Sequence, residues 1–156
     1  MPADRRIRAS ARTRLVAVQV LYAQAINIKT INTKAINTKQ HNDLFETLAI
    51  ENNLSAMACT RAQAIVTHST RFDDKIRATL DEKWAFDRLE VIVRVILQAA
   101  TFELYTTDAS PKTLVSDYIA MAGAFDLGPG IGLINAVLQR LIDDKIENKT
   151  ENIDQK

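Results

Sequence analysis

The chain has 156 residues, a length typical of one domain whose hydrophobic core needs no disulfide or metal for support. Its four glycines and three prolines are few for a turn-rich sandwich or barrel and favour an all-α fold. The single cysteine, Cys59, excludes an internal disulfide and is typical of a reducing compartment. No secretory leader pattern follows Met1 and no apolar run is long enough to cross a bilayer, so we expect a cytoplasmic protein with no membrane partner.

The net charge of +1 is distributed unevenly along the chain. Residues 1–14, which we call the basic arm, combine five arginines with Asp4 for a charge of +4, which leaves −3 for residues 15–156. A basic segment on a mildly acidic body is typical of binding to a polyanion, although a solvated helix start would have the same composition. The arginines of the basic arm are Arg5, Arg6, Arg8, Arg12 and Arg14.

Residues 10–25 are expected to form an amphipathic helix, because Leu15, Val18, Tyr22 and Ala25 recur at intervals of three and four. Residues 26–40 then repeat a five-residue motif three times, as INIKT, INTKA and INTKQ. This repeat is too short and too polar for a solenoid unit, and it predicts a flexible low-complexity insertion over residues 26–43. Its lysines would either be solvated or graze a nucleic acid, and the sequence leaves both open.

Two further helices are expected before the middle of the chain. Apolar residues between Leu44 and Leu48 predict a short helix that ends near Asn52 and Asn53. Ser55 can then cap a helix over residues of about 56–80. The apolar face of that helix consists of Ala62, Ile65, Ser69, Phe72 and Ile76.

The central helix is expected from Trp84 to Leu104, because apolar residues occupy nearly its whole circumference. Asp87 lies three residues before Glu90, which is the spacing of a capping box at a helix start. A helix that is apolar nearly all round is buried in a bundle or in a membrane, and polar residues such as Arg94 make this one too broken to span a bilayer. We therefore expect the centre of a soluble helical bundle.

Two helices are expected after this central one. Ser110 followed by Pro111 is a strong start signal, with the serine as cap and the proline as first residue. The segment Gly128-Pro129-Gly130 ends that helix, and a last helix extends to about Ile142. Residues 143–156 form a polar tail that we expect to fray. The sequence thus predicts a bundle of about six to seven helices, in a single domain over residues 15–142.

No arrangement of residues typical of catalysis is found in the sequence, and we expect neither an enzyme nor a cofactor or bound metal. The segment GPGIG lacks the Walker lysine and hydroxyl and has no strand before it. The pairs Asp73–Asp74 and Asp143–Asp144 diverge by about 100° on a helix, so neither makes a two-carboxylate site. The two histidines lack partners at ligand spacing, and Cys59 is expected to be a buried structural thiol.

Three blocks of sequence, taken together, resemble one family. They are the arginine-rich start that runs into AVQVLYAQ, the helix VILQAATFEL, and the stretch from DASPKTLVSDYIAMAGAF to LINAVLQRL. In this order they resemble the NusB family of bacterial transcription antitermination factors, over residues of roughly 5–25 and 56–142. The resemblance implies a helical bundle of two packed sub-bundles.

The resemblance also implies binding to a short single-stranded RNA element in the leader of ribosomal RNA transcripts. The chain would bind it together with NusE, a small ribosomal protein, in an RNA polymerase antitermination complex that reads through terminators. Some relatives form homodimers, so the oligomeric state stays open. Sequence choice would require bases stacked on an aromatic side chain, for which Tyr22, Tyr118 and Phe125 are the candidates. The residues expected to contact RNA are Arg5, Arg6, Arg8, Arg12, Arg14, Gln19, Tyr22 and Lys112.

The chain departs from the family pattern at three positions that are expected on the RNA face. Gln98 stands where the family usually has an arginine, Gly123 replaces a lysine, and Leu133 replaces a phenylalanine. Two alternatives therefore stay open: a helical protein-interaction module that has lost RNA binding, and an RNA-targeting domain related to the similar helical domain of rRNA methyltransferases. Glu103 and Asn135 are interpreted as structural residues in caps or polar networks.

Overall fold

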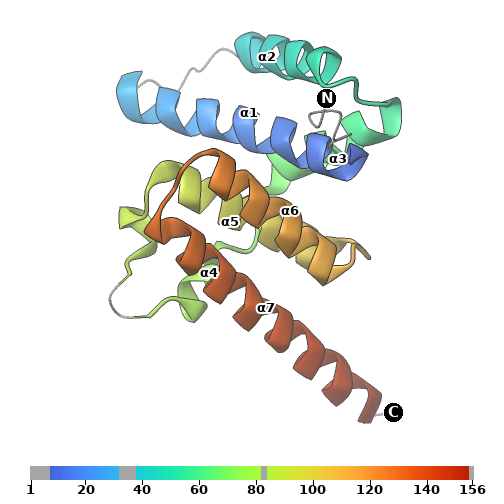
Figure 1. Cartoon of the computed structure of the whole chain (residues 1–156), viewed down its shortest axis with the longest axis vertical. Helices are drawn as coiled ribbons and strands as arrows, with labels where there is room; N and C mark the ends of the chain where they lie inside the picture. The colour runs from blue at the N-terminus through green and yellow to red at the C-terminus, as the bar shows by residue number, and fades with distance from the viewer. Residues whose placement is uncertain (1–7, 32–37, 82–83, 155–156) are drawn as a thin grey trace, which may run out of the picture. The chain divides into compact units, whose positions relative to one another are not determined.

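The structure, a computed structural model, describes residues 8–31, 38–81 and 84–154 (Figure 1). Within these residues the chain forms seven α-helices and one short 3-10 helix, with no strand, which confirms the all-α fold class. None of the described helices is long and apolar enough to cross a membrane. The elements in chain order are α1 (Ala9–Ile31), α2 (Thr38–Glu51), α3 (Ala56–His68), α4 (Asp73–Thr79), the 3-10 helix η1 (Phe86–Arg88), α5 (Val91–Thr106), α6 (Pro111–Ala124) and α7 (Pro129–Asp154).

The chain divides into two compact units, Met1–Thr67 and His68–Lys156. In the first unit, α1 packs against α2. In the second unit, α5 and α7 pack against each other, and each of them also contacts both α4 and α6 (Figure 1). The two units correspond to the two sub-bundles that the family resemblance implies.

Helix ends in the first unit follow from local sequence. Asn53 has a φ of 54°, the left-handed conformation that ends α2, and the backbone N–H of Leu54 donates to the carbonyl oxygen of Ala49 at 2.9 Å. The hydroxyl of Ser55 accepts from the backbone N–H of Ala58 at 3.1 Å. This bond satisfies one of the free donors at the start of α3 and confirms the predicted cap.

Close packing around α5 fixes the second unit. Ile96 and Leu97 of α5 and Leu138 of α7 have no exposed surface, so their apolar area is removed from water. Gly130, in the first turn of α7, lies so near α5 that a Cβ atom at this position would be 2.9 Å from Cγ2 of Val93. Only a glycine allows α7 to approach α5 at this distance.

The low-complexity repeat is more helical than predicted. α1 continues to Ile31 and α2 begins at Thr38, so residues 26–31 and 38–43 are helical where the sequence predicted a loop. The repeat contains neither glycine nor proline, and its isoleucine, alanine and lysine residues are all compatible with a helix. The middle of the predicted insertion, residues 32–37, lies outside the described residues.

The single helix predicted over residues 56–80 is instead two helices. α3 ends at His68 and α4 begins at Asp73. Phe72, at the start of α4, has φ −113° and ψ 23°, which lies outside the helical range. Asp73 and Asp74 occupy the first turn of α4, where carboxylates interact favourably with the helix dipole. This aspartate pair was the sequence signal for a new helix start, and apolar periodicity alone hid it.

The central helix begins later than predicted. The 3-10 helix Phe86–Arg88 comes first, and the residues on both sides of it are extended, so α5 starts only at Val91. The predicted capping box does not form, because Glu90 is the N-cap residue and its side chain makes no capping hydrogen bond. Asp87 lies outside α5 and forms an ion pair with Arg77 at 3.6 Å.

The start of α6 agrees with prediction, whereas the end of α7 does not. Pro111 is the first residue of α6, although Ser110 makes no capping hydrogen bond with its side chain. α7 continues to Asp154, beyond its predicted end, and no glycine or proline interrupts residues 143–154. The hydroxyl of Tyr105 on α5 donates to Oδ2 of Asp144 at 2.8 Å, which anchors the first turn of the extension. The polar tail is therefore helical through Asp154 rather than frayed.

Candidate nucleic-acid interface

One face of α1 carries most of the described residues that are expected to contact RNA. Starting at Arg8, just before the helix, the members of this face follow at intervals of four, three, four, three and four. At about 100° per residue, positions with this spacing stay within an arc of about 80°. Each of them is exposed or half-buried, whereas positions 13, 14, 16–18, 20 and 21 are buried. This face, which we call the α1 stripe, consists of Arg8, Arg12, Leu15, Gln19, Tyr22 and Ile26.

The α1 stripe combines cations, an amide and an aromatic ring. The backbone N–H of Arg12 donates to the carbonyl oxygen of Arg8 at 3.1 Å, which keeps Arg8 in helical register with the stripe. Tyr22 is 38% exposed, so it is not fully packed into the core and part of the residue is accessible. The side-chain oxygen of Gln19 is buried and accepts no hydrogen bond from the part of the chain that the structure describes. The Nε atom of Arg12 is likewise buried and makes no hydrogen bond with the described part of the chain.

The other basic residues expected to contact RNA do not share the α1 stripe. Arg14 is only 4% exposed and lies about 120° around α1 from the stripe, so it differs from the accessible cation that was expected. The charge of the basic arm does not show on which side of α1 each arginine lies. Lys112 is exposed in the first turn of α6, in the second unit. Arg5 and Arg6 lie outside the described residues.

Of the three aromatic candidates for base stacking, only Tyr22 is exposed. Tyr118 has no exposed surface, and its hydroxyl donates to Oε2 of Glu103 at 2.7 Å. Its expected availability for stacking is therefore wrong, and Glu103 takes part in a polar contact inside the second unit, as interpreted from sequence. Phe125, at the end of α6, is half-buried. Asn135 is exposed on α7, which does not support the structural role expected for it.

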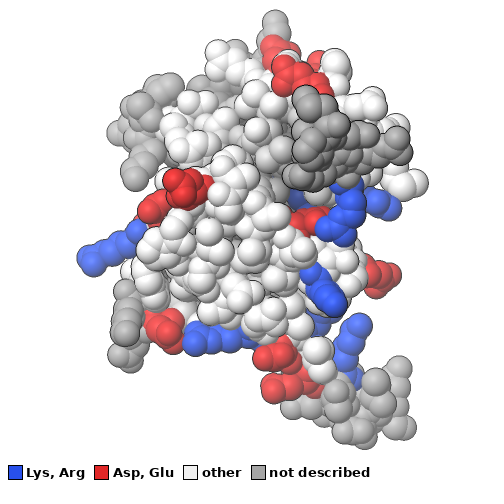
Figure 2. All heavy atoms as spheres, viewed as in Figure 1, with Lys and Arg blue, Asp and Glu red and all other residues white. Residues whose placement is uncertain are grey.

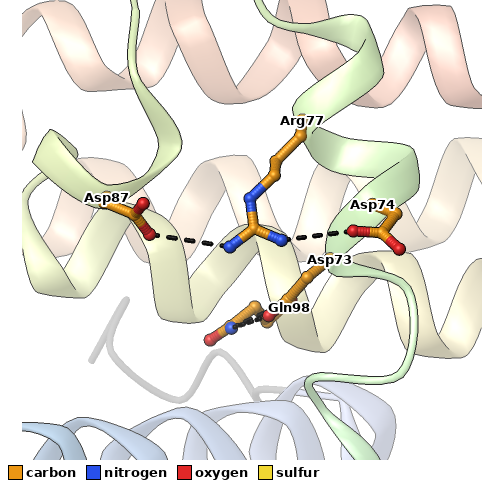
Figure 3. A network of polar contacts seen from close by, with 5 residues as sticks. All are labelled: Asp73, Asp74, Arg77, Asp87 and Gln98. Atoms are coloured by element: carbon orange, nitrogen blue, oxygen red, sulfur yellow. Dashed lines mark hydrogen bonds and ion pairs between the residues drawn. The ribbon is translucent and has the colours of Figure 1, made fainter.

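Gln98 is a structural residue rather than part of an exposed RNA face. Its side chain is 8% exposed, and its Nε2 donates to both carboxylate oxygens of Asp73, at 3.0 and 3.3 Å (Figure 3). Burial raises the pKa of Asp73 above its usual value, while the hydrogen bond from Gln98 and the charges of Arg77 and Arg94 oppose that rise. Position 98, where the resemblance implied an arginine, therefore takes part in a contact between α5 and α4. The other two departures are accessible, since Gly123 is exposed and Leu133 is half-buried.

Arg77 joins α4 to the segment before α5. Its guanidinium lies between two carboxylates, 3.2 Å from Oδ1 of Asp74 and 3.6 Å from Oδ1 of Asp87 (Figure 3). It also stacks over the ring of Phe86, 4.5 Å from the ring centroid. These contacts occupy Arg77 within the second unit and hold η1 against α4.

The excess of basic charge is concentrated at the start of the chain. On the face of the second unit seen in Figure 2, lysine and arginine side chains alternate with aspartate and glutamate around an uncharged area. The basic arm, by contrast, carries a charge of +4 over 14 residues. A polyanion would therefore be attracted mainly to the start of the chain.

Asp144, in the second acidic pair, contacts a side chain of another helix. Asp144 accepts the hydrogen bond from Tyr105, and burial together with this carboxylate raises the pKa of the tyrosine. Among the described residues no three side chains that bind metals lie close enough to hold an ion. Cys59 is half-buried, which differs from the fully buried thiol that was predicted.

Comparison with known proteins decides the family. The family model for NusB matches residues 11–143. The chain belongs to the NusB family. A transcription antitermination protein NusB from Rhizobium rhizogenes is 33% identical over 132 residues, which cover 82% of each protein. Proteins with the same name from Caulobacter vibrioides and a Bradyrhizobium species are 28% and 32% identical, over 89% and 88% of this chain and 95% and 84% of their own. No solved structure is significantly similar to the chain.

The match to the NusB family includes the α1 stripe from Arg12 onward but begins after Arg8. Sequence reasoning missed that Leu15 and Ile26 belong to the same face as the candidate RNA contacts. Their spacing from Arg12 and Tyr22 in the sequence was the available signal, because alternating steps of three and four define one helix face. This spacing identifies residues that share a face of α1, but it does not show whether that face is accessible or buried.

Proposed function

We propose that this NusB-family protein is an RNA-binding transcription antitermination factor. It would bind the single-stranded leader antitermination element of ribosomal RNA transcripts together with NusE, and would promote read-through by RNA polymerase without catalysing a reaction. The family match over residues 11–143 and the names of the relatives support the antitermination role. The RNA-binding part of the proposal rests on the α1 stripe, which places Arg8, Arg12, Gln19 and Tyr22 on one face of a helix.

The arginines of the basic arm supply the affinity that does not depend on RNA sequence. Each phosphate contact on a single strand contributes about −0.7 to the slope of log affinity against log salt concentration. Arg14 is buried, so the other four arginines together with Lys112 of the second unit would make three to five contacts. These contacts give a slope of roughly −2 to −3.5. These charges position the RNA but do not read its sequence.

Sequence selection is assigned to the neutral members of the α1 stripe. A base stacked on the exposed ring of Tyr22 would place its edge near Gln19, one helical turn away. Gln19 is half-buried, and its amide group is of a type that can donate to and accept from a base edge. One aromatic ring is a small platform, so we expect weak binding by the chain alone and tighter binding when NusE extends the surface.

A gel-shift titration of leader RNA with and without NusE tests the proposal. We expect NusE to raise the RNA affinity of the wild-type protein at least tenfold. Arg8→Glu/Arg12→Glu should lower the affinity in both conditions, because two cations of the stripe become anions. The matched control is Arg71→Glu/Arg88→Glu, which reverses two exposed arginines of the second unit and should leave the RNA affinity within about twofold. Equal affinities for wild type and the Arg8→Glu/Arg12→Glu protein would contradict the proposal.

A second candidate function is a helical protein-interaction module that has lost RNA binding. The burial of Arg14 favours it, because one of the expected phosphate contacts does not face solvent. The same titration discriminates, since this alternative predicts no specific RNA binding at any salt concentration, with NusE present or absent. Binding of NusE alone, measured by calorimetry, would then be the surviving activity.

A further inference from the structure

A groove in the second unit lies where α7 extends beyond the ends of its neighbours. α5 ends at Thr106 and α6 begins at Pro111, while α7 continues to Asp154 (Figure 1). The groove has a cavity volume of about 170 Å³. It is lined by Leu104, Asp108, Ala109, Pro111, Ile142, Lys145, Ile146 and Lys149.

The floor of the groove is aliphatic and incompletely covered. Leu104 is buried, Ile142 is half-buried, and Ile146 is 57% exposed. These two isoleucines are four residues apart on α7, so they continue the face that packs on α5 further up the helix. An isoleucine exposed to this extent beside a concave apolar surface offers area that a partner can bury.

The rim of the groove is positively charged. Lys145 and Lys149 lie one turn apart on α7, and Asp108 is the single carboxylate among the lining residues. The ammonium group of Lys145 donates to the carbonyl oxygen of Leu104, a bond that leaves its charge in place. Among the described residues no carboxylate lies within ion-pair distance of Lys149, which is exposed. The first turn of α6 adds the positive end of a helix dipole near Pro111.

We propose that this groove binds an acidic peptide segment of a partner protein, with one aliphatic or aromatic side chain in the cavity and flanking carboxylates against the two lysines. The cavity is smaller than the roughly 300–1,000 Å³ of typical small-molecule sites, and it fits about one bulky side chain. The lining contains no aromatic ring for a base to stack on, which distinguishes it from sites for single-stranded nucleic acid. The excess of lysines over carboxylates selects an acidic segment over a basic one.

This site is separate from the function proposed above. The family match ends at residue 143, so Lys145, Ile146 and Lys149 lie beyond it. The α1 stripe belongs to the other unit. Peptide binding at the groove can therefore fail or succeed independently of RNA binding.

Nuclear magnetic resonance titration of the ¹⁵N-labelled full chain tests the proposal with three probes. The probes are an acidic peptide (Glu-Asp-Leu-Phe-Asp-Glu), a basic peptide (Lys-Arg-Leu-Phe-Arg-Lys) and a hexauridine oligonucleotide. We expect the acidic peptide to shift the backbone amides of residues 104–112 and 142–149 in a saturable way, and the other two probes to shift them at least fivefold less at equal concentration. Larger shifts with hexauridine than with the acidic peptide would contradict the proposal and indicate that the groove binds nucleic acid. Shifts scattered over the chain would show that the peptide does not bind at this groove.

Variants on exposed positions of α7 complete the test without disturbing the core. Lys149→Glu and Ile146→Ser should each weaken acidic-peptide binding at least fivefold, because they remove a rim cation and an apolar contact. Gln139→Glu, on an exposed position of the same helix, should change it less than twofold. Unchanged peptide binding in Lys149→Glu and Ile146→Ser, with the amide spectra of the folded chain retained, would contradict the proposal.

Discussion

The two units of this protein use polar side chains for different purposes. In the second unit they join helices that are far apart in sequence: Gln98 to Asp73, Tyr105 to Asp144, and Arg140 to the carbonyl oxygen of Thr79 at 2.6 Å. In the first unit, the α1 stripe presents two arginines, an amide and a tyrosine on the accessible face of one helix. The same residue types therefore join helices to one another in the second unit and lie along one face of a single helix in the first.

This difference predicts which measurement each substitution will affect. Changes in the core and polar contacts of the second unit should lower the free energy of unfolding and leave RNA affinity per folded molecule unchanged. Changes at the exposed positions of the α1 stripe, Arg8 and Tyr22, should lower RNA affinity and have less effect on the free energy of unfolding, because exposed positions contribute little to stability. Substitutions in the two units, taken in order of expected effect, test this separation.

Leu138→Ala should have the largest effect and should act on stability alone. Leu138 has no exposed surface, so its truncation leaves a cavity in the second unit. We expect urea titration to show a loss of about 2–5 kcal/mol in the free energy of unfolding. The control is Gln139→Ala, at the next and exposed position, which should stay within about 0.5 kcal/mol of wild type. A loss below about 1 kcal/mol for Leu138→Ala would show that this position is less tightly packed than the structure indicates.

Tyr22→Ala should weaken RNA binding without affecting stability. Loss of a base-stacking ring is expected to reduce the free energy of RNA binding by about 1–3 kcal/mol, as measured by fluorescence anisotropy with leader RNA. Tyr22→Phe keeps the ring and should retain most of the affinity.

Tyr118→Phe, in the second unit, is the tyrosine substitution to be compared with Tyr22→Ala in the first. It removes the hydroxyl that is bonded to Glu103, so it should lower the free energy of unfolding by about 1 kcal/mol and leave RNA affinity unchanged. The separation of roles would be refuted if Tyr22→Ala destabilised the protein more than Tyr118→Phe and left RNA binding intact.

Asp73→Asn should have the smallest effect, visible as a change in pH dependence. Because burial raises the pKa of Asp73 in the folded state, its contribution to stability is greatest below the unfolded-state pKa and is lost as pH rises through the folded-state pKa. The asparagine side chain of the variant would still accept from Gln98 and would not titrate. We therefore expect the stability of the variant relative to wild type to increase between about pH 4 and pH 7. Thermal unfolding at the two pH values measures this, and a relative stability that decreased with pH would mean that the pKa of Asp73 is lowered instead.

Local signals in the sequence identified the fold class and several helix ends. The Ser55 cap and the Pro111 start depend on neighbouring residues, so they could be recognised without the rest of the chain. The outcome of the Asp87–Glu90 prediction is instructive, because the spacing was right for a capping box but the carboxylate of Asp87 pairs with Arg77. That partner lies ten residues away, and no local pattern reveals it.

The residue types of the candidate site could be predicted from the sequence, whereas their accessibility could not, because it depends on distant parts of the chain. Its residue types could be read from the charge of the basic arm and from the family resemblance, but their accessibility could not. Arg12 and Arg14 are two positions apart and were treated alike, yet Arg14 is buried and Arg12 lies on the α1 stripe. Which side of α1 is covered depends on packing with distant parts of the chain, which the sequence does not display locally.

The salt dependence of RNA binding tests the central claim most directly. We propose to measure the affinity of wild type and of Arg8→Ala/Arg12→Ala for leader RNA at several salt concentrations, and to compare the slopes of log affinity against log salt. If the α1 stripe contacts phosphates through both arginines, the wild-type slope should be roughly −2 to −3.5 and the slope of the variant should be shallower by about 1.4. Identical slopes for the two proteins would contradict the assignment of the α1 stripe to RNA.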